Sequence, residues 1–252
     1  MIFDIHAHIF PQKIAQRAAV NIGKFYNMDD MRHAGSTEEL LSAMQSGGID
    51  RALVHSVAMS STQPAIINDF ITSQVNAHPD KLVGFATLHP DMAAPEEELE
   101  RALNMGLKGV KIHSDMQQVA LTDSRMDAIY DACQQFSCPM LLHMGDSRYH
   151  YDNPAQVPQV LRRFPRLTLI CAHMGGYTEW DAACEHLLKE NVLVDTSSTY
   201  FAVGAQRWQQ LVRAFGADRV LWGSDFTMWD PGEEKRVFES LDLTSNEREK
   251  IF

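Results

Sequence analysis

The chain has 252 residues, of which 45 % are hydrophobic and 22 % charged, and these are the proportions of a folded globular protein, not of a disordered one. A formal net charge of −11 and the lack of any Lys/Arg-rich run exclude the clustered basic surface that nucleic acids require, so no nucleic-acid partner is expected. The four cysteines include no CxxC pair and no apolar run is long enough to cross a bilayer, so the sequence predicts a cytoplasmic protein with no membrane partner.

Short apolar segments recur along the chain, each rich in Val, Ile, Leu or Phe. Such segments are typical of strands that are buried on both faces of a parallel sheet. In chain order the eight segments read IFDIHAH, RALVHSVA, LVGFATLHP, GVKIH, PMLLH, LTLICAH, NVLVDTS and RVLWGSD.

Segments with helical periodicity lie between these strands. In residues 36–48, Ser36 is the expected N-cap, with Glu39 three residues later, and Gly47 is expected to end the helix. In residues 94–106, Pro95 lies in the first turn and acidic residues near the positive helix end. Five later segments carry an apolar stripe of the same kind: SRMDAIYDACQQF, PQVLRRF, EWDAACEHLLKE, AQRWQQLVRAFG and EEKRVFESL.

The alternation of strands and helices predicts an α/β fold, a closed (β/α)₈ TIM barrel. Eight units of roughly thirty residues account for the chain, so residues 1–252 are expected to form a single domain. An open doubly wound sheet is the competing architecture, but no GxGxxG follows any predicted strand, which removes its commonest dinucleotide-binding form.

Residues 10–35, after the first predicted strand, are longer than a typical βα loop. They read as partly helical and partly polar. Long loops in compact domains are often lids or binding loops, and an ordinary surface excursion is the equally compatible alternative.

Histidines recur at the same point of successive units. Each of the following ends a predicted strand: His8, His55, His89, His113, His143 and His173. His6 lies two residues before such an end, on the same strand face as His8. In a TIM barrel the carboxyl ends of the strands form the rim where active sites are built. The placement therefore favours a functional cluster over scattered core histidines.

A carboxylate joins this set at the end of the eighth predicted strand, where Asp225 stands in WGSDF. In a closed barrel the eighth strand neighbours the first, so Asp225 is expected near His6 and His8, with His143 converging from the fifth strand. Imidazoles with one carboxylate suit Zn²⁺, with Mn²⁺ or Fe²⁺ as alternatives. Such an ion lowers the pKa of a bound water to about 7. Asp225 would accept that water's proton, and His173 would orient substrate, shuttle a proton or bind a second metal.

These motifs resemble the amidohydrolase superfamily, in the amidohydrolase-related branch that includes aminocarboxymuconate-semialdehyde decarboxylase-like and resorcylate decarboxylase-like enzymes. The resemblance spans nearly the whole chain, through DIHAH, GVKIH, LLHMGD, CAHMGG and WGSDF. It implies a metal held by His6, His8, His143 and Asp225, with His173 catalytic in one-metal members and a ligand in two-metal members. PHP-type phosphoesterases and TatD-like nucleases share the opening phrase but not the later motifs.

The segment GVKIH raises the question of a second ion. The resemblance implies that Lys111 would bridge two ions as a carbamate in a two-metal member, whereas a structural or substrate-binding lysine is the favoured alternative. His113 shares its strand face and is likewise a candidate for a second metal or for substrate. One ion is favoured over two. Thr227, two residues after Asp225, stands where the family often has proline.

Arg148 follows the fifth predicted strand, in HMGDSRYHYDNP, and is expected at the mouth of the barrel. A guanidinium there suits a substrate carboxylate, and a plain surface arginine is the alternative. Tyr149, His150 and Tyr151 are expected to line the same mouth, with Tyr149 a candidate substrate contact.

The predicted function is that of a metal-dependent hydrolase, which attacks a small polar, carboxylated organic substrate through a metal-activated water. The same ligands would serve a decarboxylase or a hydratase, so lyase chemistry is the alternative. A non-catalytic metal- or partner-binding barrel is the alternative from another class, and the complete ligand set argues against it. A small molecule is the expected partner, and a homodimer is compatible with the sequence.

Overall fold

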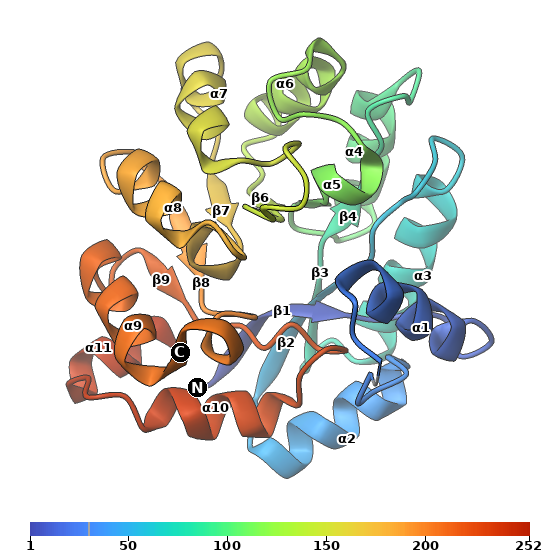
Figure 1. The fold of residues 1–252 in the computed structure, drawn as a ribbon. Coiled ribbons are helices and arrows are strands. Elements are labelled where there is room, and N and C mark those ends of the chain that lie inside the picture. The colour runs from blue at the N-terminus through green and yellow to red at the C-terminus, as the bar shows by residue number, and fades with distance from the viewer. Residues whose placement is uncertain (30) are drawn as a thin grey trace.

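The structure, a computed structural model, describes residues 1–29 and 31–252 and confirms the predicted (β/α)₈ barrel (Figure 1). The strands are β1 (Phe3–His8), β2 (Arg51–His55), β3 (Leu82–Gly84), β4 (Ala86–Thr87), β5 (Val110–Ile112), β6 (Met140–Leu142), β7 (Leu169–Cys171), β8 (Leu193–Asp195) and β9 (Val220–Leu221). They pair in parallel, in the order β1-β2-β3 and β4 through β9.

The third predicted strand is divided between β3 and β4, which is why nine strand segments stand for eight barrel strands. Phe85 lies at the division, and its N–H donates to Val54 O at 3.0 Å, so the barrel wall continues across it. The last strand meets the first through an isolated parallel bridge between Ala7 and Phe226. Asp225 N also donates to His6 O at 2.8 Å. These contacts close the barrel.

Helices surround the strands, as the view along the barrel shows (Figure 1). They are α1 (Ala15–Tyr26), α2 (Thr37–Gly47), α3 (Pro64–Ala77), α4 (Pro95–Asn104), α5 (Ser114–Gln117), α6 (Asp127–Gln135), α7 (Val157–Arg163), α8 (Trp180–Leu187), α9 (Tyr200–Phe215), α10 (Pro231–Glu239) and α11 (Ser245–Ile251). None of these helices, over the residues described, has the length and apolar character needed to span a bilayer.

Most predicted helices form where expected. Glu39 N donates to Ser36 Oγ at 3.2 Å, which is the predicted N-cap of α2. The helix ends one residue later than predicted, because Gly48 and not Gly47 adopts the left-handed conformation, with φ 65°. Helix α3 was not among the predicted helices. Its content of Ile, Thr and Val explains this, since β-branched residues lower helix propensity.

The apolar core has two parts. The larger part packs the helices against the outside of the strands. The smaller part joins side chains from strands around the whole barrel: Ile5, Leu53, Phe85, Leu141, Ile170 and Ala172. Side chains from opposite strands meet only in the barrel interior, so this cluster is the plug beneath the rim.

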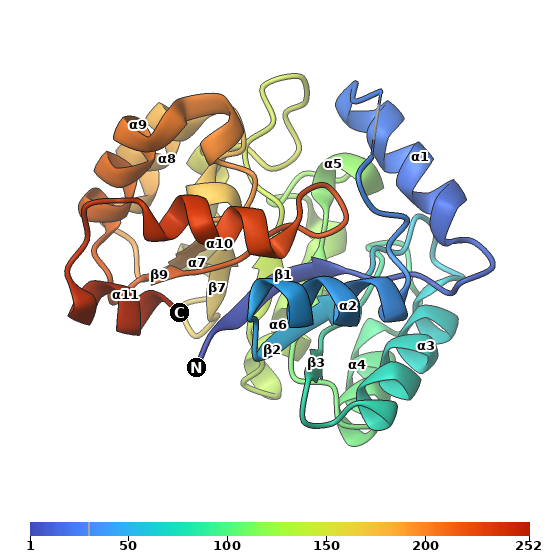
Figure 2. The ribbon, with the colours of Figure 1, turned by 90° about the horizontal axis from the view of Figure 1, so that it is seen from below.

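The long segment after β1 folds back over the rim. It contains α1, which rises at one side of the molecule while α9 lies at the other, with the loop after β6 between them (Figure 2). Residues of α1 line the cavity described below. The segment is therefore a wall of the cavity and not an excursion away from it.

Candidate metal centre and cavity

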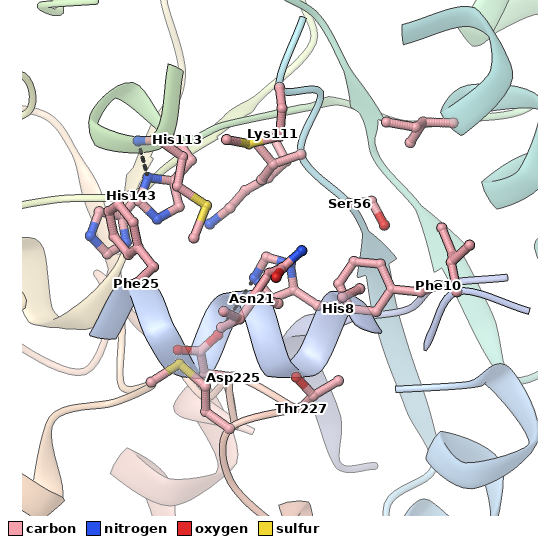
Figure 3. Close-up of a pocket in the computed structure, with 18 of the residues that line it drawn as sticks. His8, Phe10, Asn21, Phe25, Ser56, Lys111, His113, His143, Asp225 and Thr227 are labelled. Atoms are coloured by element: carbon pink, nitrogen blue, oxygen red, sulfur yellow. Dashed lines mark hydrogen bonds and ion pairs between the residues drawn. The ribbon is translucent and has the colours of Figure 1, made fainter. Parts of the chain in front are cut away.

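A cavity of about 480 Å³ opens at the carboxyl ends of the strands, beneath α1 (Figure 3). Its polar side is formed by the following residues from the rim: His6, His8, Lys111, His113, His143, His173 and Asp225. Its other side is largely apolar and includes Ile22 and Phe25 from α1, Ile67 and Phe70 from α3, and Met228. These polar residues therefore lie at one end of an apolar chamber, whereas the predicted rim histidines His55 and His89 do not line it.

Three predicted ligands from the two ends of the chain face one another. His6 Nε2 lies 3.4 Å from Asp225 Oδ1, and His8 Nε2 lies 3.5 Å from the same oxygen. Ligand atoms bound tetrahedrally to one ion at about 2.1 Å are about 3.4 Å apart. The separation of Asp225 Oδ1 from each of the two imidazole nitrogens therefore matches that of two ligands of one divalent ion.

Asp195, at the end of β8, orients His6. Its Oδ2 lies 2.8 Å from His6 Nδ1, which donates its proton and leaves the Nε2 lone pair for a metal. Asp195 Oδ1 accepts the backbone N–H groups of His173 and Ser197, each at 3.0 Å. Sequence reasoning missed Asp195 as a functional residue. It lies in the predicted strand segment NVLVDTS and is the last residue of β8, at the same end of the barrel as the histidines.

The backbone around Asp225 adopts conformations that most residues avoid. Asp225 has φ 60° and Ser198 has φ 44°, and both side chains are buried. Ser198 Oγ donates to Asp225 Oδ2 at 2.5 Å, which leaves Oδ1 directed at His6 and His8. Gly223 permits the approach, because a Cβ there would lie 2.9 Å from His6 Cβ.

Burial keeps the imidazoles of the centre neutral. Desolvation, with the nearby Lys111 cation next in size, lowers the pKa of His6 and of His8 well below the ordinary value. Desolvation similarly lowers the pKa of His55 and brings that of His173 to about 4. Neutral imidazole is the form that binds metal, so the protonation states suit the ligand role.

Lys111 is fully buried beside the centre, and its Nζ donates to His6 Nε2 at 3.1 Å. Burial lowers the pKa of this amine to about 8, against the opposing effects of Asp195 and Asp225. Lys111 therefore contacts a candidate ligand of the centre. Bridging two ions and binding substrate both remain predictions for it.

His173 connects the centre to a second group of imidazoles. Its Nε2 lies 2.9 Å from His143 Nδ1, and its Nδ1 lies 2.9 Å from Ser197 Oγ. The His143 ring stacks on His113 with centroids 3.8 Å apart, and His113 Nε2 lies 2.8 Å from Tyr26 Oη. His143 thus contacts His173 and His113, while its role as the fourth ligand of the ion remains a prediction.

Arg148 joins the loop after β6 to the end of α1. Its Nε and Nη2 donate to the Asp146 carboxylate, at 3.0 and 2.5 Å, and its Nη1 donates to Phe25 O at 2.7 Å. The guanidinium lies over the rings of Phe25, Tyr26 and Tyr149, and Tyr149 stacks on Phe25. These contacts clamp α1 over the rim. Substrate binding by Arg148 or Tyr149 remains a prediction.

Comparison with known proteins agrees with this arrangement. A family model described as Amidohydrolase matches residues 3–252. The chain belongs to this family. The match covers nearly the whole chain, so the resemblance to amidohydrolases that the sequence motifs suggested is confirmed.

Solved structures share the fold of this amidohydrolase at low identity. 5-Carboxyvanillate decarboxylase from Novosphingobium aromaticivorans, complexed with manganese and a nitrobenzoic acid, is 18 % identical with a TM-score of 0.75, over 100 % of this chain and 93 % of that one. A dihydroxybenzoic acid decarboxylase from Polaromonas sp., with manganese and 2-nitroresorcinol, is 17 % identical with a TM-score of 0.75, over 99 % and 93 %.

A 4-oxalomesaconate hydratase from Rhodopseudomonas palustris has the same fold. It is 22 % identical with a TM-score of 0.69, over 100 % of this chain and 93 % of that one. These solved structures thus include two lyase chemistries on one barrel fold, and two of them contain manganese.

Proposed function

We propose that this amidohydrolase family member is a metal-dependent decarboxylase of a small carboxylic acid with an apolar body. The observation that carries the proposal is the convergence of His6 Nε2 and His8 Nε2 on Asp225 Oδ1, at the polar end of an apolar cavity. The decarboxylases among the structural relatives support it. Hydrolysis, predicted from the sequence, becomes the second candidate.

A divalent ion fits the three facing side chains. His6 and His8 would each offer Nε2 and Asp225 would offer Oδ1, with His143 the predicted fourth ligand. When bound, the ion would hold the oxygens of the substrate and stabilise the negative charge that develops beside the breaking bond. Zn²⁺ is the ion we expect from the ligand types, and Mn²⁺ is the ion present in two relatives.

The reaction breaks the bond between the carboxyl group and its neighbouring carbon. Carbon dioxide leaves, the electron pair stays on that carbon, and a proton replaces the carboxyl group. Asp225 would carry the proton to the carbon, because it lies at the polar end of the cavity, and desolvation raises its pKa to about 6 while no ion is bound. One proton from solution restores Asp225. His173, held by Ser197, would orient a substrate oxygen.

The apolar walls favour this chemistry. A carboxylate is less stable in a chamber lined by Ile22, Phe25, Phe70 and Met228 than in water, whereas neutral carbon dioxide is not penalised there. The clamp between Arg148 and the end of α1 would keep water out during the reaction. The apolar chamber also suits the body of an aromatic or other unsaturated acid.

Hydrolysis has one observation in its favour. Lys111 Nζ lies 3.1 Å from His6 Nε2, so this lysine, as a carbamate, would be within reach to help hold a second ion. In that case an activated water would attack an acyl carbon, and Asp225 would accept its proton. Addition of water to a double bond, as in the named hydratase, would use the same groups.

The test separates these reactions by their products. Protein reconstituted with Zn²⁺ or Mn²⁺ is incubated with hydroxylated and methoxylated aromatic acids, their amides and esters, and unsaturated dicarboxylic acids. Release of carbon dioxide, lost in Asp225→Asn and retained in Glu98→Gln, is the expected result. Glu98→Gln is the matched control, because Glu98 is a buried carboxylate already paired with Arg101 and Asn68. Hydrolysis of amides or esters without carbon dioxide release would overturn decarboxylation in favour of the second candidate. Turnover equal with and without metal would overturn both.

A further inference from the structure

The cavity continues beyond the candidate metal centre, between α1 and α3. Phe10 stacks on His8, with ring centroids 6.5 Å apart, and lies with Ser56 on the side of the cavity away from His113 (Figure 3). Apolar side chains from the two helices form the walls of this part, at spacings of three and four residues that place them on one face of each helix. They are Ile14, Ala18 and Ile22 from α1 and the residue before it, and Ile66, Ile67 and Phe70 from α3.

The outer end of this part opens to solvent through apolar side chains. Ile14 is 38 % exposed, Met59 53 % and Ile66 71 %, and all three line the cavity. They are three of the six large hydrophobic side chains that are exposed in the described part of the chain. Apolar side chains that gather at an exposed opening are typical of a binding site, because covering them removes apolar surface from water. Ile14, Met59 and Ile66 are called the apolar mouth below.

Packing of the fold does not account for the most exposed of these side chains. Helix α3 is held to the barrel by its opposite face, where Asn68 Nδ2 donates to Thr87 O at 3.1 Å and Asn68 Oδ1 accepts Thr87 N–H at 2.8 Å. Ile71, on the same inner face, is fully buried. Ile66 lies on the outer face and contributes little to this packing. Its apolar surface is therefore available to a ligand.

The charges along the cavity separate its two ends. Asp225 is the only carboxylate among the described residues that line it, and it lies at the metal centre. Near the apolar mouth the lining contains Arg17, which is exposed, and Gln63, whose Oε1 accepts Met59 N–H at 2.6 Å. The aliphatic stem of an exposed arginine can lie along an apolar chain while its charge stays in water. The outer part of the cavity therefore suits an apolar chain.

We propose that the substrate is an elongated acid, with its carboxyl group at the ion of His6, His8 and Asp225 and an apolar tail between α1 and α3 that ends at the apolar mouth. This inference rests on the proposed function, which places the carboxyl group at the ion. The cavity volume of about 480 Å³ agrees with it, because cavities of about 300 to 1,000 Å³ accommodate ligands larger than a single small acid.

Ala18 is the position that determines how long a tail the cavity accepts. Its side chain is the smallest on the lining face of α1, one turn from Ile14 and one turn from Ile22, so a larger group there would fill the space between the helices. Val20 lies two residues further along the same helix, is 42 % exposed and does not line the cavity. The pair allows the same substitution inside and outside the cavity.

The experiment measures binding of saturated straight-chain carboxylates, from butanoate to decanoate, to the Zn²⁺-loaded protein by calorimetry. These probes stay intact, because a saturated chain does not stabilise the electron pair that loss of carbon dioxide would leave. The Kd of the wild type should fall about fourfold for each methylene that is buried, and should level off once the tail reaches the apolar mouth. Ala18→Trp should lose most of this dependence on chain length, and Val20→Trp should keep it.

A second pair of variants protects the test against misfolding. Ile66 and Val20 are both exposed, so Ile66→Asp and Val20→Asp should fold, which circular dichroism checks. Ile66→Asp should weaken decanoate more than butanoate, whereas Val20→Asp should treat the two alike. Removal of Zn²⁺ should weaken every chain length by the same factor, since it removes the partner of the carboxyl group and not that of the tail.

Three results would overturn the inference: a Kd independent of chain length in the wild type, the same dependence in Ala18→Trp as in Val20→Trp, or equal affinities with and without metal. Release of carbon dioxide from aromatic acids together with a Kd independent of chain length would overturn the elongated substrate and leave decarboxylation in place. A dependence on chain length without carbon dioxide release from any acid would support the tail site and overturn decarboxylation. The two proposals therefore fail separately.

Discussion

The two sides of His173 differ in how their polar side chains are held. On the side of Asp225, two of the three candidate ligands have a hydrogen-bond partner that orients them, Asp195 for His6 and Ser198 for Asp225. On the other side, Asp115 and the Nε2 of His143 lack hydrogen-bond partners within the part of the chain that the structure describes. The first arrangement is a prepared site whose ligands converge without metal. The second is a group of buried polar atoms that the hydrogen bonds of the described residues leave without partners.

The largest expected effect is on turnover, and it comes from a substitution on the side of His173 where Asp225 lies. Asp225→Asn removes both a metal ligand and the proposed proton donor while leaving the shape of the side chain. We expect kcat to fall by about 100- to 10 000-fold, the range for a general acid. Steady-state rates with metal added in excess measure this, and unchanged turnover would remove the assigned role.

The next largest effect is expected on the amount of bound metal. His8→Ala should lose the ion at His6 and Asp225, because only two of the three facing ligand atoms remain. The barrel should stay folded, since His8 lies at the rim and not in the apolar plug. Metal analysis together with circular dichroism checks this. A full complement of metal in a folded His8→Ala protein would mean that the ligands are misassigned.

A smaller effect is expected from the orienting carboxylate. Asp195→Asn keeps the shape of the group but weakens its hold on the His6 Nδ1 proton, and such changes lower metal affinity about 10- to 100-fold. Titration with Zn²⁺ against a competing chelator gives the affinity. An affinity equal to that of Glu98→Gln would show that His6 is oriented by other contacts.

The neutral imidazoles predict a pH dependence of the metal-free protein. The pKa values of His6, His8, His55 and His173 lie below the ordinary 6.5 in the folded state, so the unfolded chain takes up protons first as pH falls. Their contribution to stability is therefore present above pH 6.5 and is lost below it. Buried carboxyls such as Asp225, whose pKa is raised to about 6, act in the opposite direction, so the rings are followed individually. Histidine-ring NMR of the folded, metal-free protein between about pH 7.5 and about pH 5.5 should show these four rings neutral throughout. Rings that take up protons near pH 6.5 would mean that they are not buried as neutral groups.

The smallest effect concerns Arg148, where sequence and structure point to different outcomes. Binding of a substrate carboxylate predicts that Arg148→Ala raises KM far more for an acid than for a neutral analogue. The contacts with Asp146 and Phe25 predict a clamp on α1, and hence a similar rise for both. Parallel KM measurements decide between them, with Arg163→Ala, on the outer helix α7, as the control.

The candidate ligands that could be predicted from the sequence are those whose position depends on where a strand ends. His6, His8 and Asp225 were recognisable because each follows or ends an apolar strand, and barrel closure then brings them together. Asp195 occupies the same kind of position at the end of β8 but was not among the residues singled out from the sequence. For the segment that contains α1, the sequence left two alternatives open, a lid and a surface loop, because both have the same composition. The structure shows that α1 forms a wall of the cavity.

The buried carboxylates on the other side of His173 were beyond the reach of sequence reasoning. Asp115 lies in α5, and Asp146 and Asp152 lie in the loop after β6, so their meeting depends on how these segments pack around His143. Neither periodicity nor spacing encodes that packing. The stacking of His143 on His113 and the pairing of Arg148 with Asp146 depend on it in the same way.

The central claim is that the two ends of the chain hold one ion between them. Crystals of the Zn²⁺- or Mn²⁺-loaded protein, measured at the absorption edge of the metal, test it most directly. The account predicts an anomalous peak about 2.0 to 2.2 Å from His6 Nε2, His8 Nε2 and Asp225 Oδ1. A loaded crystal with no peak among these three atoms would contradict it.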